Sequence, residues 1–497
     1  REEKRSSEKT LQQSLPRRNQ GIAGRFTYAY DSRYFAEFNF GYNGSERFAA
    51  HERYGFFPSF GLGYIISNED FWKDNLGEST SLKLRASWGM SGNNNIGNYE
   101  YATIMSSPAG AVFGNGTIVS AMYPGGVKDN AIGWETTSQY NVGFDLSLFN
   151  NRLSVSGNYY LSYTKDLLFE QPISAISGAN FMLTNLPDSK IRNTGFDLQV
   201  DARVLTGKDY SLNVSGNISL NRNKVLNLGG NKIITNGAER SYMTHITEEG
   251  QPIGMFYGFK VAGMVTEADM AGLAADDAVY KANGNSFPEG YELQGPPRSL
   301  SQSVALQPGD LYFEDVNGDG VVNNNDVVPI GATTKPNMIY GFGFSAAWKG
   351  LDFNVLFQGA GKSSFFINGF TVYPFQENSW GNILNDVPGN YWSLGENENP
   401  HATYPRLSYG GNSNNYRAST YWLRDGSYLR LKNLDIGYTI PKRLVNRIRL
   451  DNVRIYLMGT NLLTFSNFKL WDPELGSSNG QEYPLAKSYT IGLTINL

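Results

Sequence analysis

The stretch LSVSGNYYLSYT, residues 153–164, shows the pattern that decides the fold. Every second side chain is apolar, and the positions between them carry mostly Ser, Asn and Thr. The apolar positions are Leu153, Val155, Tyr159, Leu161 and Tyr163. Because successive side chains of a strand point to opposite sides, this stretch predicts a β-strand with one apolar and one polar face.

The same alternation recurs along the whole chain and predicts an all-β protein. We count thirteen such segments, at 21–31, 33–44, 54–67, 80–92, 138–148, 153–164, 194–205, 210–222, 337–348, 352–361, 427–440, 452–464 and 486–497. Their charges fall on the polar face, and they include Lys83, Arg85, Asp197, Asp201, Arg203 and Asp352. We expect these charges of mixed sign to pair with one another. The alternative is contact with a plug or a substrate.

Alternation alone fits both a soluble sandwich and a membrane barrel, and the connections separate the two. Short turns alternate with mostly long connections, at 45–53, 93–137, 165–193, 223–336, 362–426 and 465–485. This asymmetry, with strands of about ten or more residues, is typical of an outer-membrane barrel. We therefore predict a transmembrane antiparallel β-barrel with short periplasmic turns and long extracellular loops. Aromatic residues near strand ends then fit interfacial girdles: Tyr28, Tyr30, Tyr42, Trp88, Tyr140, Trp348 and Tyr438.

Composition excludes several classes of function. The 497 residues include no Cys, which removes disulfides, thiolate catalysis and Cys-ligated metals. Only three His are present, and the net charge of −4 is unlike that of a nucleic-acid binder. The chain has no GxSxG, HExxH or P-loop motif, so we expect no enzymatic activity. No apolar run reaches the roughly 18 residues of a transmembrane helix.

The strand count leads to an expectation about the two ends of the chain. Alternation continues to the last residue, Leu497, as in a strand that closes a barrel. Bacterial single-chain barrels have an even number of strands, whereas thirteen are counted here. We therefore expect residues 1–20 to be the remnant of an extracellular loop. Residues 21–497 would form the C-terminal part of a larger barrel, with further chain preceding them.

Four segments are more specific than the alternation: WLRDGSYLRLKNLDIGYTIPKRL (422–444), GQPIGMFYGFKVAGMV (250–265), GDLYFEDVNGDGVVNNNDVVPIG (309–331) and YPLAKSYTIGLTINL (483–497). They resemble the C-terminal half of the SusC/RagA family of TonB-dependent transporters. The resemblance implies a barrel of about 22 strands with an N-terminal plug, absent from this chain, in a Gram-negative outer membrane of Bacteroidetes type. It also implies nutrient import energised by the TonB complex through that plug, a SusD/RagB-like lipoprotein as lid, and dimers of transporter–lipoprotein pairs.

The resemblance leaves the substrate open between glycan and peptide, and family frequency favours a glycan. Two other readings of the residues remain. One is a passive porin or specific channel, which would need no plug. The other is a surface adhesin or lectin-like sandwich, against which the loop asymmetry argues. Partners expected from the sequence are therefore outer-membrane lipid, the lipoprotein, TonB and the substrate, without nucleic acid.

The segment DVNGDGVVNNND, residues 315–326, has the spacing of a calcium-binding loop. The expected ligands are Asp315, Asn317, Asp319, the carbonyl of Val321, Asn323 and Asp326. The last position is Asp rather than Glu, which shortens the arm that would bind the ion with both oxygens. We expect Ca²⁺ to rigidify the long loop 223–336, and the alternative is a metal-free loop of Asx turns.

Aromatic residues of loop 362–426 are candidates for contact with a substrate or partner: Phe370, Tyr373, Trp380, Tyr391 and Trp392. A connection of this length must also bury some of its own apolar side chains, so the alternative is a small core within the loop. We favour the core or the partner over direct contact with substrate.

Overall fold

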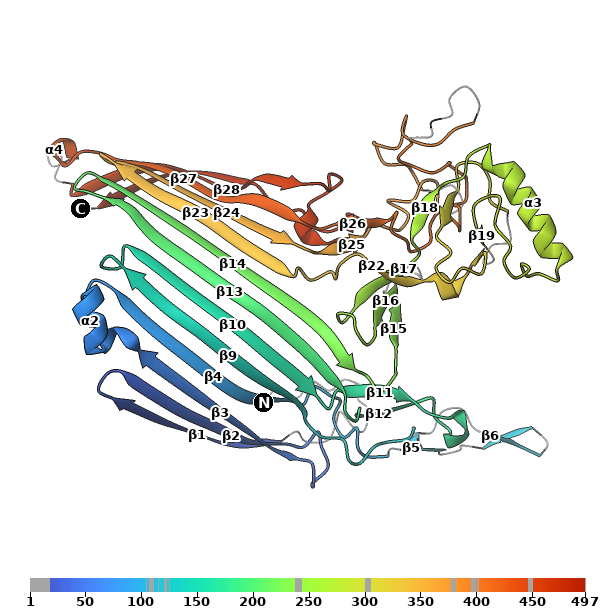
Figure 1. Ribbon diagram of the computed structural model, residues 1–497, viewed down its shortest axis with the longest axis horizontal. Helices are drawn as coiled ribbons and strands as arrows, with labels where there is room; N and C mark the ends of the chain where they lie inside the picture. Colours follow the sequence, from blue (N-terminus) through green and yellow to red (C-terminus); the bar gives the residue numbers. More distant parts are fainter. Residues whose placement is uncertain are drawn as a thin grey trace. The chain divides into compact units, whose positions relative to one another are not determined.

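The computed structural model describes residues 18–103, 105–106, 111–114, 116–119, 123–124, 126–236, 244–299, 305–376, 381–394, 399, 402–445 and 450–496. Its main feature is a 13-stranded sheet in the order β1-β2-β3-β4-β9-β10-β13-β14-β23-β24-β27-β28-β29 (Figure 1). These strands are β1 Asn19–Tyr30, β2 Tyr34–Ser45, β3 Tyr54–Ile65, β4 Ser81–Asn93, β9 Glu135–Leu148, β10 Leu153–Lys165, β13 Lys190–Thr206, β14 Tyr210–Asn227, β23 Met338–Trp348, β24 Leu351–Gly361, β27 Tyr428–Thr439, β28 Asn452–Ser466 and β29 Ser488–Asn496. All thirteen predicted strands are confirmed.

The chain divides into two compact units, which we describe separately. Unit 1 comprises Arg1–Arg203 and Ser219–Asn231, and unit 2 comprises Val204–Ile218 and Lys232–Leu497. Among the described residues, no helix is both long and apolar enough to cross a membrane.

In unit 1, antiparallel pairing brings apolar side chains into rows across the strands. Phe26 pairs with Phe38, Phe38 with Phe60, and Phe60 with Trp88. The ring centroids along this row are 6.3, 4.7 and 5.8 Å apart. Yet Phe26 is 66 % exposed and Phe60 is 50 % exposed. The apolar face of the sheet is therefore its outward face, as in a barrel whose outside contacts lipid.

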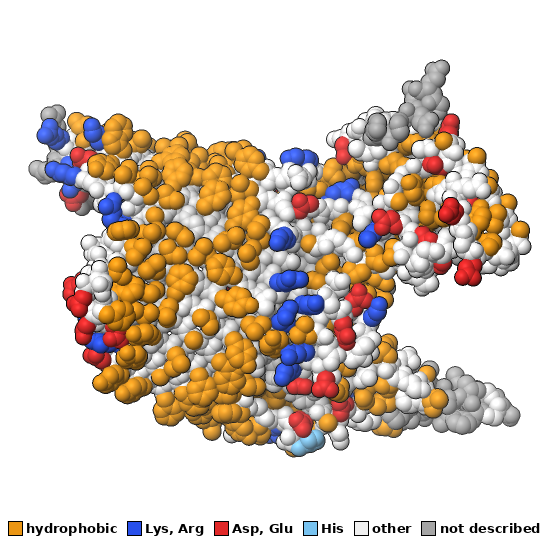
Figure 2. All heavy atoms as spheres, viewed as in Figure 1, with side chains coloured by type: hydrophobic (Ala, Val, Ile, Leu, Met, Phe, Trp, Pro, Cys, Tyr) orange, Lys and Arg blue, Asp and Glu red, His pale blue; other side chains and the backbone are white. Residues whose placement is uncertain are grey.

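In each unit, apolar side chains cover the outward face of the strands in the space-filling view (Figure 2). Most of the expected girdle aromatics are exposed on it: Tyr28, Tyr30, Tyr42, Tyr140, Trp348 and Tyr438. Trp88 is partly covered, because Phe60 stacks on it. A soluble sandwich would bury this face, so the structure has the apolar and polar sides of a membrane barrel.

In unit 2, strands β23, β24, β27, β28 and β29 pair in sequence, each antiparallel to the next. Their outward residues are mostly aliphatic, and the exposed ones include Ile455, Leu457, Ile491 and Leu493. The register of β27 against β28 shifts between Leu431 and Asn433, where Asn461 takes a positive φ of 53°. This is a β-bulge, which bends a strand locally.

Short turns and long connections alternate as the sequence predicts. Lys349 and Gly350, both with positive φ, form a two-residue hairpin turn between β23 and β24. Two of the connections expected to be simple turns carry short helices: η1 Ile66–Asn68 with α2 Asp70–Leu76, and α4 Lys442–Val445.

The long connections carry secondary structure of their own. They hold β5 Met105–Ser106, β6 Ala111–Phe113, β7 Thr117–Val119, β8 Tyr123–Pro124, β11 Leu168–Pro172, η2 Ala175–Ser177, β12 Phe181–Asn185, β15 Ile233–Asn236, β16 Thr244–Thr247, β17 Met255–Gly258, β18 Val261–Met264, α3 Asp269–Ala282, β19 Arg298–Ser299, β20 Leu311–Phe313, β21 Val321–Val322, η3 Asn324–Asp326, β22 Val328–Ile330, β25 Ser364–Phe366, β26 Leu423–Asp425 and η6 Pro473–Leu475.

Candidate functional site: the loop block and the inner wall

Three connections of unit 2 pack together into what we call the loop block: the described residues of 232–337, 362–427 and 467–487. Its core is aromatic and draws on all three connections, with Phe256, Phe366, Trp422 and Phe468 buried in one cluster. Trp422 is 1 % exposed, and its indole N–H donates to the carbonyl of Asn415 at 2.5 Å. The long loops thus form a folded body with a core of its own.

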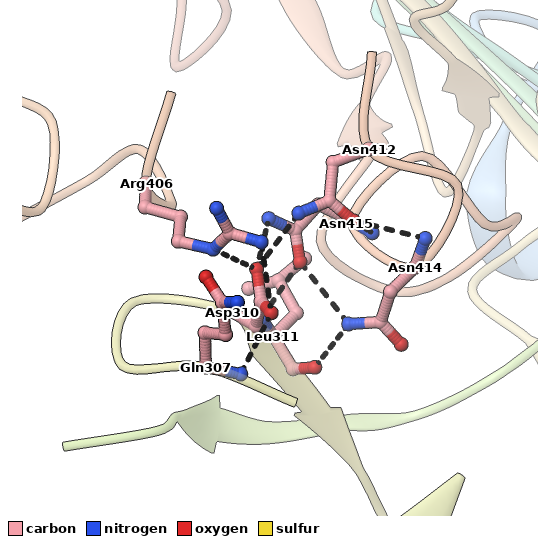
Figure 3. Close-up of polar contacts among 7 residues, drawn as sticks. All are labelled: Gln307, Asp310, Leu311, Arg406, Asn412, Asn414 and Asn415. Atoms are coloured by element: carbon pink, nitrogen blue, oxygen red, sulfur yellow. Dashed lines mark hydrogen bonds and ion pairs between the residues drawn. The ribbon is translucent and has the colours of Figure 1, made fainter. Parts of the chain in front are cut away.

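The carboxylate of Asp310 is the polar centre of the loop block (Figure 3). It is 3 % exposed, and the guanidinium of Arg406 binds its two oxygens at 2.6 and 3.3 Å. The side-chain amides of Asn412 and Asn415 donate to it at 2.8 and 3.1 Å, and the backbone N–H of Gln307 at 2.9 Å. A buried carboxylate is stable only with such a full set of donors. Asp310 therefore ties two connections that are about a hundred residues apart in sequence.

Neighbouring amides extend this network along the backbone. Asn415 accepts from the N–H of Leu311 at 2.9 Å, and Asn414 donates to the carbonyl of Leu311 at 2.6 Å. The ring of Trp392 packs against Gly309 and leaves no room for a Cβ there, and the φ of +83° also favours glycine. The sequence analysis misses this network, although the amide-rich run GGNSNNY, residues 410–416, is a signal that would have pointed to it.

A half-buried cation, Arg417, stabilises the loop block through aromatic rings. Its guanidinium lies 4.6 Å from the ring centre of Phe259 and 5.8 Å from that of Phe313, and it donates to the hydroxyl of Ser299 at 3.2 Å. Burial lowers the pKa of Arg417 to about 10. The guanidinium remains charged at neutral pH and joins the connection around residue 417 to the one around residue 313.

The predicted aromatic site residues divide into buried and exposed ones. Tyr373 and Trp392 are buried, and the ring of Tyr373 stacks on Tyr416 with centroids 4.4 Å apart. These two correspond to the alternative of a core within the loop. Phe370 is 52 % exposed and Tyr391 is 37 % exposed, so both offer a face to a ligand or partner. Trp380 lies outside the described residues.

The sequence analysis did not single out one exposed aromatic of the same loop. Tyr409 is 75 % exposed, and its ring stacks on Phe375 with centroids 4.8 Å apart. Tyr409 was missed because a single Tyr in an irregular segment has no period to mark its exposure.

The calcium-like loop is closed by its own hydrogen bonds. The two oxygens of Asp315 accept from the backbone N–H groups of Gly318 and Gly320, at 2.8 and 2.6 Å. Asp326 is fully buried, and its oxygens accept from the N–H groups of Val316 and Asn323, at 2.9 and 2.7 Å. Asp326 therefore holds the loop together, while Asp315 remains nearer to solvent.

The other expected ligands of this loop are also tied into its turns. Asn317 accepts from the N–H of Asp319 at 2.9 Å, Asp319 from Val321 at 2.8 Å, and Asn323 from Asn325 at 2.8 Å. Within the described part of the chain, no three His, Asp or Glu side chains converge as they would around an ion. A cation would therefore need amide and carbonyl oxygens beside the carboxylates of Asp315 and Asp319, a donor set that suits Ca²⁺.

The polar face of unit 1, which we call the inner wall, lines a hollow of about 970 Å³. Four of its charges form ion pairs, Arg25 with Glu37 at 2.7 Å and Arg85 with Asp145 at 3.0 Å, whereas Lys83 forms no ion pair with a described carboxylate. In unit 2, the polar-face residue Asp352 pairs with Arg454. The expectation of mutual pairing thus holds for Arg85 and Asp352. Between the charges, the hollow is lined by amides and hydroxyls: Asn39, Ser59, Ser87, Gln139 and Asn141.

Comparisons with known proteins agree with this architecture. The family model described as "TonB dependent receptor-like, beta-barrel" matches residues 9–319. TonB-dependent receptor P3 of Formosa agariphila is 31 % identical over 491 residues, which cover 95 % of this chain and 45 % of that protein. TonB-dependent receptor SusC of Bacteroides thetaiotaomicron is 27 % identical over 479 residues, covering 95 % and 43 %.

A solved structure of the RagAB peptide transporter shares the fold. It aligns with a TM-score of 0.72 at 24 % identity, covering 96 % of this chain and 47 % of that one. The chain spans about half the length of the relatives it matches.

Proposed function

The chain belongs to the TonB-dependent receptor β-barrel family, and from that premise we propose that the whole protein imports a bulky nutrient with energy from TonB. Barrels of this family lie in the outer membrane, and its members are transporters and receptors rather than enzymes. The observation that carries the proposal is the family match over residues 9–319, on strands whose apolar side faces outward.

For the substrate we favour an oligosaccharide and keep an oligopeptide as the second candidate. Support for a glycan comes from the inner wall, where ion pairs such as Arg85 with Asp145 leave amides and hydroxyls, beside apolar groups, to meet a solute. Such groups match the many hydroxyls of a sugar and neither attract nor repel it by charge. The peptide alternative is supported by the RagAB transporter, which shares the fold.

For the partner we propose a SusD-like lipoprotein that covers the loop block as a lid. The exposed aromatics Phe370 and Tyr391 are the anchors that we assign to this contact or to the substrate beneath it. The buried Tyr373 and Trp392 contribute by holding the loop in shape. Pairs of transporter and lipoprotein would associate as dimers.

Energy dependence distinguishes the proposal from a passive channel. A host strain that lacks the gene is complemented with the full-length gene, and uptake of fluorescent oligosaccharides and oligopeptides is measured with and without an uncoupler. We expect uptake of one substrate class, and its loss when the proton gradient is collapsed. Uptake that survives the uncoupler would indicate a porin, and unchanged uptake in the deletion strain would indicate an adhesin.

The lid is tested in the same strain with Phe370→Ala and Tyr391→Ala together. We expect co-purification of the lipoprotein to fall while the barrel still reaches the membrane. The matched control is Tyr409→Ala, which removes a more exposed ring of the same loop. An equal loss of lipoprotein in the control would contradict the assignment to Phe370 and Tyr391.

We also propose that the loop at 315–326 binds Ca²⁺ through Asp315, Asn317, Asp319 and the carbonyl of Val321. Calcium titrated into the purified full-length protein should raise the unfolding midpoint of the loop block, and its free energy of unfolding should rise by about 2.7 kcal/mol at a hundredfold excess over the Kd. Asp315→Asn with Asp319→Asn should abolish the shift, and Asn325→Ala should keep it. Identical midpoints in calcium and in chelator would assign the loop to Asx turns without metal.

A further inference from the structure

Five basic residues gather on the outward face of unit 1 where the strands reach the long connections. We call this cluster the basic rim, and its members are Lys165, Lys190, Arg192, Arg222 and Lys224. Figure 2 shows Lys and Arg side chains in a row along the border of the apolar band that is nearest the long connections.

The strand register places the first three residues on the lipid-facing side. Lys165 pairs with Lys190, and Tyr163 pairs with Arg192. Alternate positions of a strand share a face, so these residues continue the row in which Tyr159 pairs with the outward Phe196. The basic rim is therefore an extension of the apolar outward face and does not belong to the inner wall.

Two contacts align β14 with this row. The side-chain amide of Asn223 donates to Asn193 at 2.6 Å, and the hydroxyl of Thr194 donates to the carbonyl of Arg222 at 3.5 Å. Residues 194 and 222 thus lie opposite each other, two positions from Arg192 along β13. Both basic residues of β14 consequently share the outward face.

The basic rim has no compensating acid in the described part of the chain. None of its five residues forms an ion pair with a described carboxylate, whereas the inner wall pairs Arg25 with Glu37 and Arg85 with Asp145. The ammonium of Lys190 lies 4.3 Å from the ring centre of Tyr163. This cation–π contact stabilises the ammonium at the edge of the apolar band without a carboxylate.

The five cations of the basic rim border a lipid-facing band, so they lie at the depth of the lipid headgroups and attract anionic groups there. We propose that the basic rim binds the phosphate-bearing headgroup of an outer-leaflet lipid, whose acyl chains lie on the apolar band. Lys and Arg form charge-assisted hydrogen bonds with phosphate oxygens, and basic clusters at membrane interfaces select anionic headgroups. The inference rests on the proposed function only in placing the long connections outside the cell.

Lipid binding is measured by native mass spectrometry on the full-length protein in detergent. The probes are lipid A with its phosphates and the same lipid A after removal of phosphate. We expect the phosphorylated form to bind more tightly. The triple variant K190Q/R192Q/K224Q should lose about tenfold or more of that affinity, because each cation near an anionic surface contributes separately. Raised salt should weaken binding in the same direction.

The matched control removes three cations from the opposite ends of the strands, as K73Q/K208Q/K442Q. We expect the control to bind phosphorylated lipid A as the unmodified protein does. Equal binding of the two lipids, or unchanged binding in the rim variant, would overturn the proposal. Loss of the partner lipoprotein from the rim variant, with lipid binding intact, would also overturn it and assign the rim to a protein contact. The readout is independent of transport, so failed uptake leaves this result standing.

Discussion

The outward face of the sheet and the loop block obey opposite rules of burial. On the sheet, Phe26 and Phe60 are large and apolar and yet exposed. In the loop block, Asp310 is charged and yet buried, held by Arg406 and two amides. The sheet satisfies its backbone through strand pairing, so its outward side chains are free to match lipid. The strands of the loop block have only two to four residues, so many of its buried polar groups depend on individual side-chain hydrogen bonds.

The largest expected effect comes from breaking the centre of the loop block. Asp310→Ala removes the buried carboxylate and leaves the largely covered guanidinium of Arg406 without a partner. The loss of a buried ion-pair partner costs about 3–5 kcal/mol of stability. We expect the loop block to open while the sheet persists. Hydrogen exchange should then speed up in residues 305–313 and 402–416 and stay slow in the strands.

Asp310→Asn serves as the companion variant because it keeps the shape and removes the charge. Hydrogen exchange in the loop block of this variant should be faster than in the unmodified protein and slower than in Asp310→Ala. If exchange speeds up equally in the strands after Asp310→Ala, the loop block and the sheet unfold as one unit, and the contrast between them fails.

The next effect tests the sheet by placing the same charge on its two faces. Phe60→Lys directs an ammonium outward into lipid, which costs about 2–4 kcal/mol near the middle of the membrane. Ser59→Lys, one residue earlier, directs it toward the inner wall and should cost far less. The folded fraction in lipid vesicles across a urea series measures both. Equal losses would show that β3 does not separate lipid from lumen.

The thirteen strands were predictable because apolar side chains recur at every second position of the sequence. In β10, five apolar residues alternate with polar ones, and each falls on the expected face. The loop block was not predictable in this way. Asp310 and Arg406 are nearly a hundred residues apart, and nothing local marks either as a partner of the other. The burial of Tyr373 likewise depends on Tyr416 in a distant part of the same loop.

Short helices escaped prediction for a related reason. Helix α2 has 7 residues, too few for an apolar period to stand out, and it forms where a simple turn was expected. Its first residue follows Glu69, which accepts from Arg33 at 2.7 Å and from Tyr34 at 2.7 Å. The helix is thus fixed by contacts with another strand end, which local sequence does not encode.

A smaller effect is expected from the paired charges of the inner wall. Arg85 and Asp145 are both more than a third exposed, so their coupling should amount to about 0.2–1 kcal/mol. A double-mutant cycle with Arg85→Gln and Asp145→Asn, read from urea unfolding in vesicles, measures it. A coupling free energy as large as the effect of Asp310→Ala would mean that water is excluded from the inner-wall charges as completely as from the core of the loop block.

The smallest effect is a pH dependence confined to the loop block. His245 lies in β16 with its ring 4.7 Å from that of Phe256, and burial lowers its pKa. The unfolded chain therefore takes up the proton first, at a pKa of about 6.5. Stability should be flat above that pH and fall as the pH drops below it, until the folded form is protonated too. The loop-block midpoint, measured between pH 8 and pH 5 by hydrogen exchange, should lose part of its acid slope in His245→Phe. An unchanged slope would show that His245 does not contribute to the acid sensitivity of the loop block.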